Sequence, residues 1–239
     1  MQKLDILVFA AHPDDAELSC SGTIIKHIEQ GKRLGIVDLT RGELGSRGNA
    51  DIRAKEAEAA GQIMGIHYRT NLGMRDGFFT VDESHQLAII QQIRLGRPDI
   101  VLANAVNDRH IDHGRAARLV AEACFLSGLH RIETEYEGLQ QTAWRPRAIY
   151  HYIQDRYVKP DLVVDISAQF PKKQAAIRAY GTQFYNPNSN EVPTPISSPD
   201  FLDFIEARAR EMGRLIQVTY AEGFTVERAP GVEDMCSLL

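Results

Sequence analysis

Two hydrophobic rhythms alternate along the chain. Near-continuous apolar runs are typical of strands buried on both faces of a parallel sheet, and apolar positions at helical spacing separate these runs. The pattern predicts strands over residues 5–11, 34–39, 67–72, 100–103, 148–153 and 162–166. It predicts helices over residues 18–31, 51–64, 87–95, 114–127, 171–180 and 201–215.

The strand–helix order predicts the fold class. Repeated strand–helix–strand units imply right-handed crossovers, so we expect an α/β, Rossmann-like sheet that is mostly parallel, with helices on both faces. The second half is less regular, and residues 186–199 form a connector with four prolines. We interpret that connector as a long loop within one core. Residues 1–239 are therefore expected to form a single domain.

Composition and charge narrow the classes of function. Hydrophobic residues make up 44% and charged residues 25% of the chain, and the net charge is −5. This balance argues against a nucleic-acid partner, and no apolar stretch approaches the ~20 residues of a membrane helix. No secretory signal is visible, and Cys20, Cys124 and Cys236 form no C-x-x-C pair. We expect a cytoplasmic protein with reduced thiols and no membrane association.

Common cofactor and nucleophile signatures are missing from the first strand–helix turn. No G-x-G-x-x-G motif follows the first strand, and Gly31-Lys32-Arg33 lacks the pattern of a phosphate loop. The residues around Ser46 do not have the G-x-S-x-G spacing of a nucleophile elbow. Nicotinamide enzymes, phosphate-loop nucleotidases and serine hydrolases therefore lose support.

Two polar clusters follow predicted strands instead. The first strand runs into residues 12–17, and residues 107–113 follow the strand at 100–103, just before a helix. Ligands of open parallel sheets bind at the carboxyl ends of the strands, so both clusters are expected at one edge. Each cluster alone would be explained by a polar turn or by a helix start. Because both clusters are expected at the same edge of the sheet, we interpret them as two parts of one site.

The side chains of these clusters suit a metal ion. Two imidazoles and one carboxylate, with a fourth place left to water, form the usual ligand set of hydrolytic zinc. His12, Asp15 and His113 supply such a set. Asp14 adjoins Asp15 in a tight turn, so the two carboxylates should diverge and Asp14 should face the water.

The same residues resemble a known family. His12-Pro13-Asp14-Asp15 and His110-Ile111-Asp112-His113 are similar to the paired motifs of the LmbE-like (PIG-L) zinc N-deacetylases. The resemblance extends along nearly the whole chain and is strongest to the bacillithiol biosynthesis deacetylases, through the stretches at 38–45, 107–110 and 220–224. Many relatives have proline where this chain has Ile111.

The resemblance implies roles for individual residues. It implies Zn²⁺ held by His12, Asp15 and His113, Asp14 as the general base, and His110 as the group that assists the transition state. We expect His110 to act preferably as imidazolium, with Asp112 or Asp108 orienting the ring. The resemblance also implies a homo-oligomer, often a hexamer.

An arginine- and glycine-rich segment predicts the substrate side of the site. Residues 40–53 include Arg47 and Arg53, and arginines among glycines suit an anion. A mobile solvated loop explains the same composition. The resemblance implies N-acetylglucosaminyl malate as substrate, with Arg53 as first carboxylate partner. Arg109 is a further candidate, although a salt bridge to Asp108 or Asp112 is an equal alternative.

Other functions share parts of this pattern. The substrate could be another small acetamido sugar, such as N,N′-diacetylchitobiose or a mycothiol-type inositol conjugate. The same three ligands also occur in iron(II) oxygenases, although usually on a β-barrel. A sugar-binding protein with a structural metal would normally provide four protein ligands.

Overall fold

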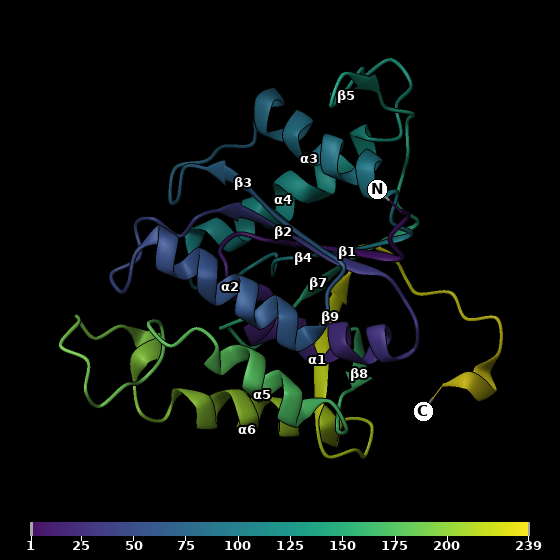
Figure 1. The fold of residues 1–239 in the computed structure, drawn as a ribbon. Coiled ribbons are helices and arrows are strands. Elements are labelled where there is room, and N and C mark those ends of the chain that lie inside the picture. Colours follow the sequence, from purple (N-terminus) through teal and green to yellow (C-terminus); the bar gives the residue numbers. More distant parts are fainter. Residues whose placement is uncertain (1, 239) are drawn as a thin grey trace.

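A seven-stranded sheet forms the centre of the molecule in a computed structural model, which describes residues 2–238 (Figure 1). The strand order is β3-β2-β1-β4-β7-β9-β8. The strands are β1 (Ile6–Ala10), β2 (Leu34–Thr40), β3 (Tyr68–Met74), β4 (Ile100–Ala103), β7 (Ala148–Tyr152), β8 (Leu162–Asp165) and β9 (Ala221–Val226). β5 (Glu135–Tyr136) and β6 (Leu139–Gln140) form a separate hairpin.

Strand β1 lies in the interior of the sheet and is buried along its whole length. It pairs in parallel with β2 on one side and with β4 on the other. Leu7 and Phe9 face one hydrophobic cluster, whereas Ile6, Val8 and Ala10 face another. This alternation explains the uninterrupted apolar run, because a strand covered on both faces buries every side chain.

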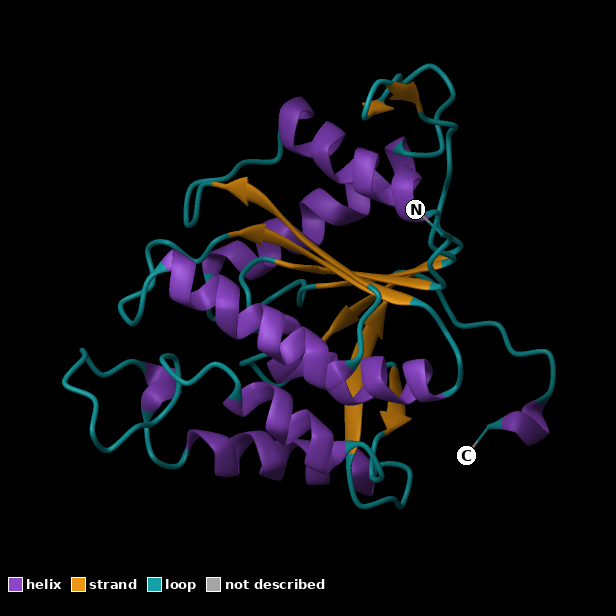
Figure 2. Cartoon of the chain, in the orientation of Figure 1, coloured by secondary structure: helices purple, strands orange, loops and turns teal. Residues whose placement is uncertain are grey.

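Helices cover both faces of the sheet (Figure 2). They are α1 (Asp15–Glu29), α2 (Ala50–Met64), α3 (Glu83–Gly96), α4 (Ile111–Leu126), α5 (Phe170–Arg178) and α6 (Phe201–Arg214). α3 and α4 pack on the face of Phe9, and α1, α2 and α5 pack on the opposite face, where α6 lies against β8 and β9. The prediction of a mostly parallel α/β sheet with two helical layers is confirmed.

The C-terminal part of the sheet differs from the sequence-based expectation. β9 is inserted between β7 and β8 and runs antiparallel to both, and its sequence was not predicted as a strand. Its Glu222 is buried because the side chain accepts hydrogen bonds from the backbone N–H groups of Gly22 and Thr23 and from Lys173. A buried carboxylate with these partners breaks the apolar pattern without breaking the strand.

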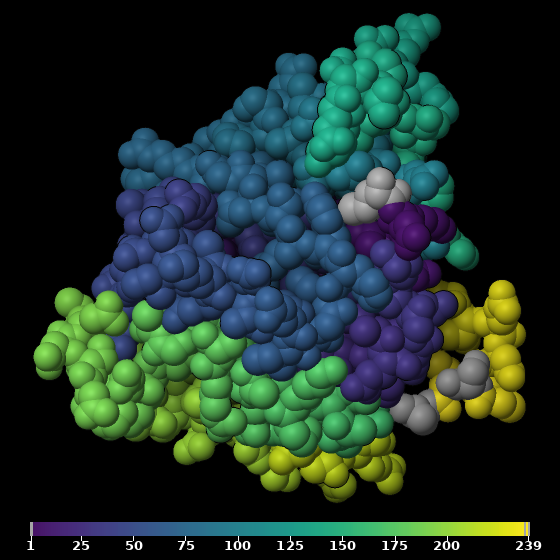
Figure 3. All heavy atoms as spheres, in the orientation of Figure 1, coloured from purple at the N-terminus to yellow at the C-terminus, as the bar shows by residue number. Residues whose placement is uncertain are grey.

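The connector between α5 and α6 is not a simple loop. It contains a short 3-10 helix, Pro195–Ser197, and it lies near the beginning of α2 in the chain fold. Figure 3 shows α5, in green, packed directly against the blue segment that contains α2. Within residues 2–238, no helix has both the length and the apolar character needed to cross a membrane.

Candidate metal centre and active site

Three imidazoles meet at the carboxyl edge of β1 and β4. His12 follows β1, while His110 caps the first turn of α4 and His113 lies within that turn. The ring centroids of His12 and His113 are 5.8 Å apart, and His110 is 4.7 Å and 5.2 Å from these two. One ring nitrogen from each residue lies within 4.8 Å of the others. The two sequence clusters therefore meet, as expected from their shared edge.

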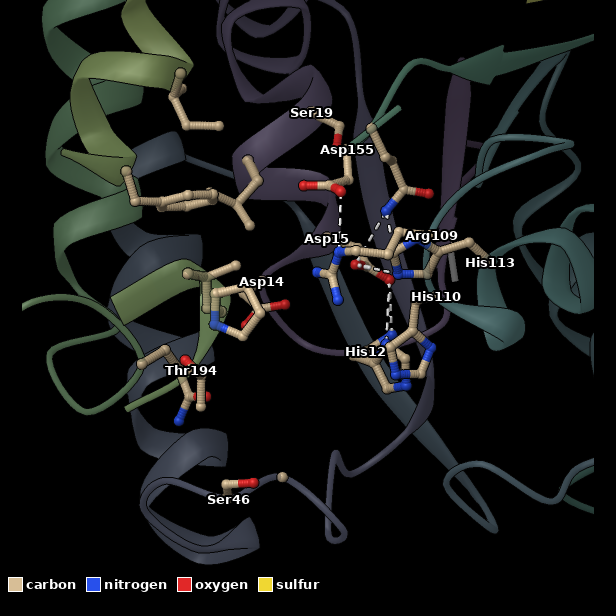
Figure 4. Close-up of a pocket in the computed structure, with 18 of the residues that line it drawn as sticks. His12, Asp14, Asp15, Ser19, Ser46, Arg109, His110, His113, Asp155 and Thr194 are labelled. Carbon is tan, nitrogen blue, oxygen red and sulfur yellow. Dashed lines mark hydrogen bonds and ion pairs between the residues drawn. The ribbon is translucent and has the colours of Figure 1, made fainter. Parts of the chain in front are cut away.

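Asp15 lies between the imidazoles of His12 and His113 (Figure 4). One carboxylate oxygen is 3.6 Å from Nδ1 of His12, and the other is 3.1 Å from Nε2 of His113. Asn104 and Gln154 donate further hydrogen bonds to the same carboxylate. Asp15 is thus buried with its oxygens directed at one nitrogen of each ring.

The outer nitrogens of both rings face other carboxylates. Nε2 of His12 lies 3.1 Å from Asp76 and 3.3 Å from Asp112, and Nδ1 of His113 lies 2.5 Å from Asp108. Carboxylates in this position fix the ring orientation and the tautomer of metal-binding histidines. They leave Nδ1 of His12 and Nε2 of His113 directed at the space beside Asp15.

Burial and charge oppose each other in this cluster. Burial alone would lower the pKa of His113, but Asp15 and Asp108 outweigh burial and raise it to about 9. Burial would also lower the pKa of His12, whereas its carboxylate neighbours raise it. The pKa of Asp15 falls well below its ordinary value because the two imidazoles outweigh its own burial. The cluster therefore stabilises the deprotonated form of Asp15 and the positively charged form of the two imidazoles.

Asp14 diverges from Asp15 and faces the pocket (Figure 4). Its backbone has φ 114°, a left-handed conformation that costs a non-glycine residue of order 1–3 kcal/mol. Within residues 2–238, no hydrogen-bond donor contacts its carboxylate. Burial raises the pKa of Asp14 to about 7, and Arg53 partly offsets this increase. Asp14 can therefore exchange a proton near neutral pH.

His110 has a different environment from the one expected from sequence. Its Nδ1 accepts a hydrogen bond from the backbone N–H of Asp112, at 3.3 Å, so the proton of the neutral ring resides on Nε2. Burial, together with the charges of His12 and His113, lowers the pKa of His110. This shift favours neutral imidazole over the expected imidazolium. The neutral ring still carries one N–H donor.

The expected position of Asp112 on the His110 ring is not observed. The Asp112 carboxylate contacts His12 and pairs with Arg115 at 2.5 Å. Asp108, the other expected partner, contacts His113. The contact that His110 makes in this turn is with the backbone of Asp112, whose N–H donates to the ring.

Arg53 reaches the pocket from the first turn of α2. The side chain of Asn49 caps this helix by accepting hydrogen bonds from the N–H groups of Asp51 and Ile52. The Arg53 guanidinium then folds back against Gly42 and Gly45, where a Cβ atom would collide with it. It is 7% exposed and donates to the side-chain amide of Gln183. Glycine in this segment therefore makes room for a buried cation.

Arg47 was predicted to bind substrate, but the structure places it elsewhere. Its guanidinium donates to the carbonyls of Thr182, Phe184 and Val192 and to the hydroxyl of Ser189. It is buried under the connector and does not line the pocket. These acceptors come from a segment more than 130 residues away in sequence. They use the hydrogen-bond donors of the guanidinium, which is therefore directed away from the pocket.

Arg109 lines the pocket, as expected for a substrate-binding candidate, and its side chain is 46% exposed. Its salt-bridge partner is neither Asp108 nor Asp112. Nε of Arg109 donates to the carboxylate of Asp155 at 2.9 Å (Figure 4).

Several residues of the site had not been singled out from the sequence, among them Asp76, Gln154 and Arg208. Asp76 follows β3 and Gln154 follows β7, so the strand-end rule that located His12 could have located both. Arg208 lies on α6, and the sequence contains no motif that marks it.

The pocket above these residues has a volume of about 460 Å³. Its base holds the imidazoles and Asp15, and its opposite wall comes from α6 and the connector. That wall contributes the apolar side chains Ile196, Phe201, Phe204 and Ile205. The size suits a small ligand with both polar and apolar surfaces.

The donor set fits a divalent cation. The ring nitrogens of His12, His110 and His113 lie close enough together to share an ion, and the Asp15 carboxylate contacts the rings of His12 and His113. Acidic groups surround the imidazoles, so a bound cation would be compensated electrostatically. Three protein ligands leave one coordination place for water or substrate.

An α/β sheet with this donor set at its carboxyl edge defines a metal-dependent hydrolytic enzyme. The model of the family "PIG-L: GlcNAc-PI de-N-acetylase" matches residues 7–124, which contain both histidine motifs. The chain belongs to this family, as its sequence motifs indicated.

Individual relatives extend the likeness beyond the matched region. The chain is similar to the conserved protein TT1542 of Thermus thermophilus, with 35% identity, a TM-score of 0.86, and coverage of 97% and 98% of the two chains. It is 28% identical over 195 residues to a probable N-acetyl-alpha-D-glucosaminyl L-malate deacetylase 2 of Bacillus anthracis, covering 75% of this chain and 81% of that protein. It is 27% identical over 200 residues to a 4-oxalmesaconate hydratase of Pseudomonas putida, covering 74% and 73%.

Proposed function

We propose that the protein is a zinc-dependent N-deacetylase that hydrolyses the acetamide of an N-acetylglucosaminide, with N-acetylglucosaminyl malate as the substrate. His12, Asp15 and His113 would hold the zinc ion. When bound, zinc supplies Lewis acidity, which makes water more acidic and polarises a carbonyl group. The observation that carries the proposal is the convergence of His12 and His113 on Asp15, beside a carboxylate free to accept a proton.

Asp14 is the proposed general base. It faces the pocket, its oxygens accept no hydrogen bond from any described residue, and its pKa lies near neutral pH. It would take a proton from the attacking water and then deliver a proton to the leaving amine. Replacing a positioned proton-transfer group costs about two to four orders of magnitude in rate.

His110 is the proposed donor to the developing oxyanion. The backbone N–H of Asp112 bonds Nδ1, so the remaining proton on Nε2 is available to the pocket. A neutral donor placed before the reaction stabilises developing charge without reorganising. Asp112 and Asp108 act as positioning residues for His12 and His113.

Arg53 is the proposed partner for a carboxylate of the malate moiety. It is a buried guanidinium bonded to a neutral amide, and within residues 2–238 no carboxylate oxygen lies within 4.0 Å of its side-chain nitrogens. Arg109 is mostly engaged by Asp155, so its contribution to binding is proposed to be smaller.

A substrate panel tests the function. One metal-defined preparation is assayed for acetate release from N-acetylglucosaminyl malate, N,N′-diacetylchitobiose and an acetamido-glucosyl inositol. We expect the malate conjugate to give the highest kcat/KM and chelation to abolish the release. Retention of activity after complete metal removal would contradict the proposal, as would turnover confined to another substrate.

Hydration of an unsaturated acid is the alternative that a relative favours, since a hydratase is 27% identical to this chain over 200 residues. The same preparation is therefore tested for hydration of 4-oxalmesaconate, followed by absorbance. Hydration without acetate release would favour the alternative. The absence of 2-oxoglutarate consumption would separate both the deacetylation and the hydration scheme from an oxygenase.

A further inference from the structure

The pocket wall opposite the imidazoles carries a second guanidinium, that of Arg208. This residue lies on α6 and lines the pocket. Its guanidinium carbon is 4.5 Å from the centroid of the Phe204 ring, and Nη2 donates to the main-chain carbonyl of Asp155. Stacking on one side and a hydrogen bond on another hold the planar group in one orientation.

The charge of Arg208 is not balanced by a direct partner. The Asp155 carboxylate pairs with Arg109, and Arg208 donates a hydrogen bond only to the main-chain oxygen of the same residue. In the part of the chain that the structure describes, no carboxylate oxygen lies within 4.0 Å of the Arg208 nitrogens. Asp155, Asp108 and Glu211 act on Arg208 through their charges, and none of their carboxylates pairs directly with its guanidinium.

The guanidinium of Arg208 is also partly desolvated by burial. Burial lowers the pKa of its guanidinium, and the charges of Asp155, Asp108 and Glu211 only partly restore it. A partly desolvated cation gains more from an incoming anion than a fully hydrated one does. The preceding turn of the helix places Phe204 and Ile205 beside it in the same pocket.

We propose that Arg208 forms a second anion-binding position, which takes a carboxylate of the aglycone while Arg53 takes another. The proposal rests on the proposed function, because it assumes that an acetamido sugar occupies the metal end of the pocket. Two guanidiniums without carboxylate partners among the described residues, on separate elements, match an aglycone with two acidic groups. α6 is therefore the wall that selects the aglycone.

Direct binding tests this position independently of turnover. The zinc-loaded full chain is titrated calorimetrically with glucosaminyl malate, methyl glucosaminide and glucosamine 1-phosphate. Arg208→Met is expected to weaken binding of glucosaminyl malate about 10- to 100-fold, and binding of methyl glucosaminide far less. Arg208→Lys should retain part of the affinity, because it keeps the charge but loses the planar fork.

The matched control is Arg210→Met on the same helix. Arg210 is exposed and bonds Glu206 and Tyr220 outside the pocket, so its replacement should leave all three affinities unchanged. Equal losses for the malate and methyl ligands in both Arg208 variants would overturn the proposal, as would unchanged malate affinity. A loss greater for glucosamine 1-phosphate than for glucosaminyl malate would overturn the carboxylate assignment. If the chain binds glucosaminyl malate through Arg208 but releases no acetate from the acetylated substrate, the result would count against the proposed function and not against the Arg208 position.

Discussion

Nδ1 of His113 lies 2.5 Å from the carboxylate of Asp108, and the opposite nitrogen of the same ring lies 3.1 Å from Asp15. Asp108 also accepts the backbone N–H of Arg156, which fixes the carboxylate itself. The ring is therefore held from outside, and its inner nitrogen is presented to the space shared with His12. His12 repeats this arrangement with Asp76 and Asp112.

This arrangement predicts that Asp108→Asn lowers metal affinity while every proposed ligand remains. Loss of such a carboxylate partner typically costs 10- to 100-fold in affinity. The zinc dissociation constant is measured by competition with a chromophoric chelator. Asp99→Asn is the control, since Asp99 pairs with Lys3 at the surface. Equal affinities of Asp108→Asn and the control would refute the positioning role.

Gly42 and Gly73 provide a matched test of Arg53. Both have positive φ, but an alanine Cβ at position 42 would strike the Arg53 guanidinium, whereas at position 73 it would meet no atom within 4 Å. Both alanine variants should lose about 1–2 kcal/mol of stability through the positive φ. Only Gly42→Ala should raise the KM for the malate conjugate, and the effect on N-acetylglucosamine should be smaller. Identical kinetics of the two variants would show that the guanidinium position does not matter.

The sequence carried enough information to place the first half of the sheet and its edge. Buried parallel strands leave a continuous apolar signal, and the strand-end rule brought residues 12 and 113 together across 101 residues. The same rule could have identified Asp76 and Gln154, which occupy equivalent strand ends.

The remaining features depend on partners that are distant in sequence. β9 was missed because the buried Glu222 is compensated by Lys173 and by two amides of α1. The position of Arg47 away from the pocket could not be predicted because its acceptors, Thr182, Phe184, Ser189 and Val192, are distant in sequence. Asp112 was assigned to the wrong ring because sequence spacing does not show which way a side chain turns at a helix start.

The raised pKa of Asp14 predicts an unusual dependence of folding stability on pH in the metal-free protein. Its folded-state pKa is about 7, above the ordinary 3.8, so the folded state binds the proton more tightly than the unfolded state does. This carboxyl group should therefore contribute a loss of stability as pH rises from about 4 to about 7, reaching roughly 4 kcal/mol. Asp14→Asn cannot ionise and should lack this loss.

Urea unfolding of metal-free wild type and Asp14→Asn at several pH values measures the difference. The variant should gain stability relative to wild type through that pH range, and the gap should stay constant above it. Parallel pH curves for the two proteins would show that Asp14 has no raised pKa.

Arg47 is predicted to stabilise the connector and not to discriminate between substrates. Arg47→Met leaves the carbonyls of Thr182 and Phe184, just before the connector, without their donor, at a cost of about 2–3 kcal/mol. Proteolysis between residues 186 and 199 should accelerate, as followed by mass spectrometry. The ratio of kcat/KM for the malate conjugate to that for N-acetylglucosamine should stay near the wild-type ratio. A selective loss on the malate conjugate would restore the original assignment.

The location of bound zinc is the most direct test of the account. A crystal of the zinc-loaded chain, measured on both sides of the zinc absorption edge, reveals the ion by its anomalous signal. We expect one ion per chain, ligated by His12, Asp15 and His113, with a coordination place open to the pocket. An ion on the other side of His12, between Asp76 and Asp112, would contradict the account, as would a site closed by four protein ligands.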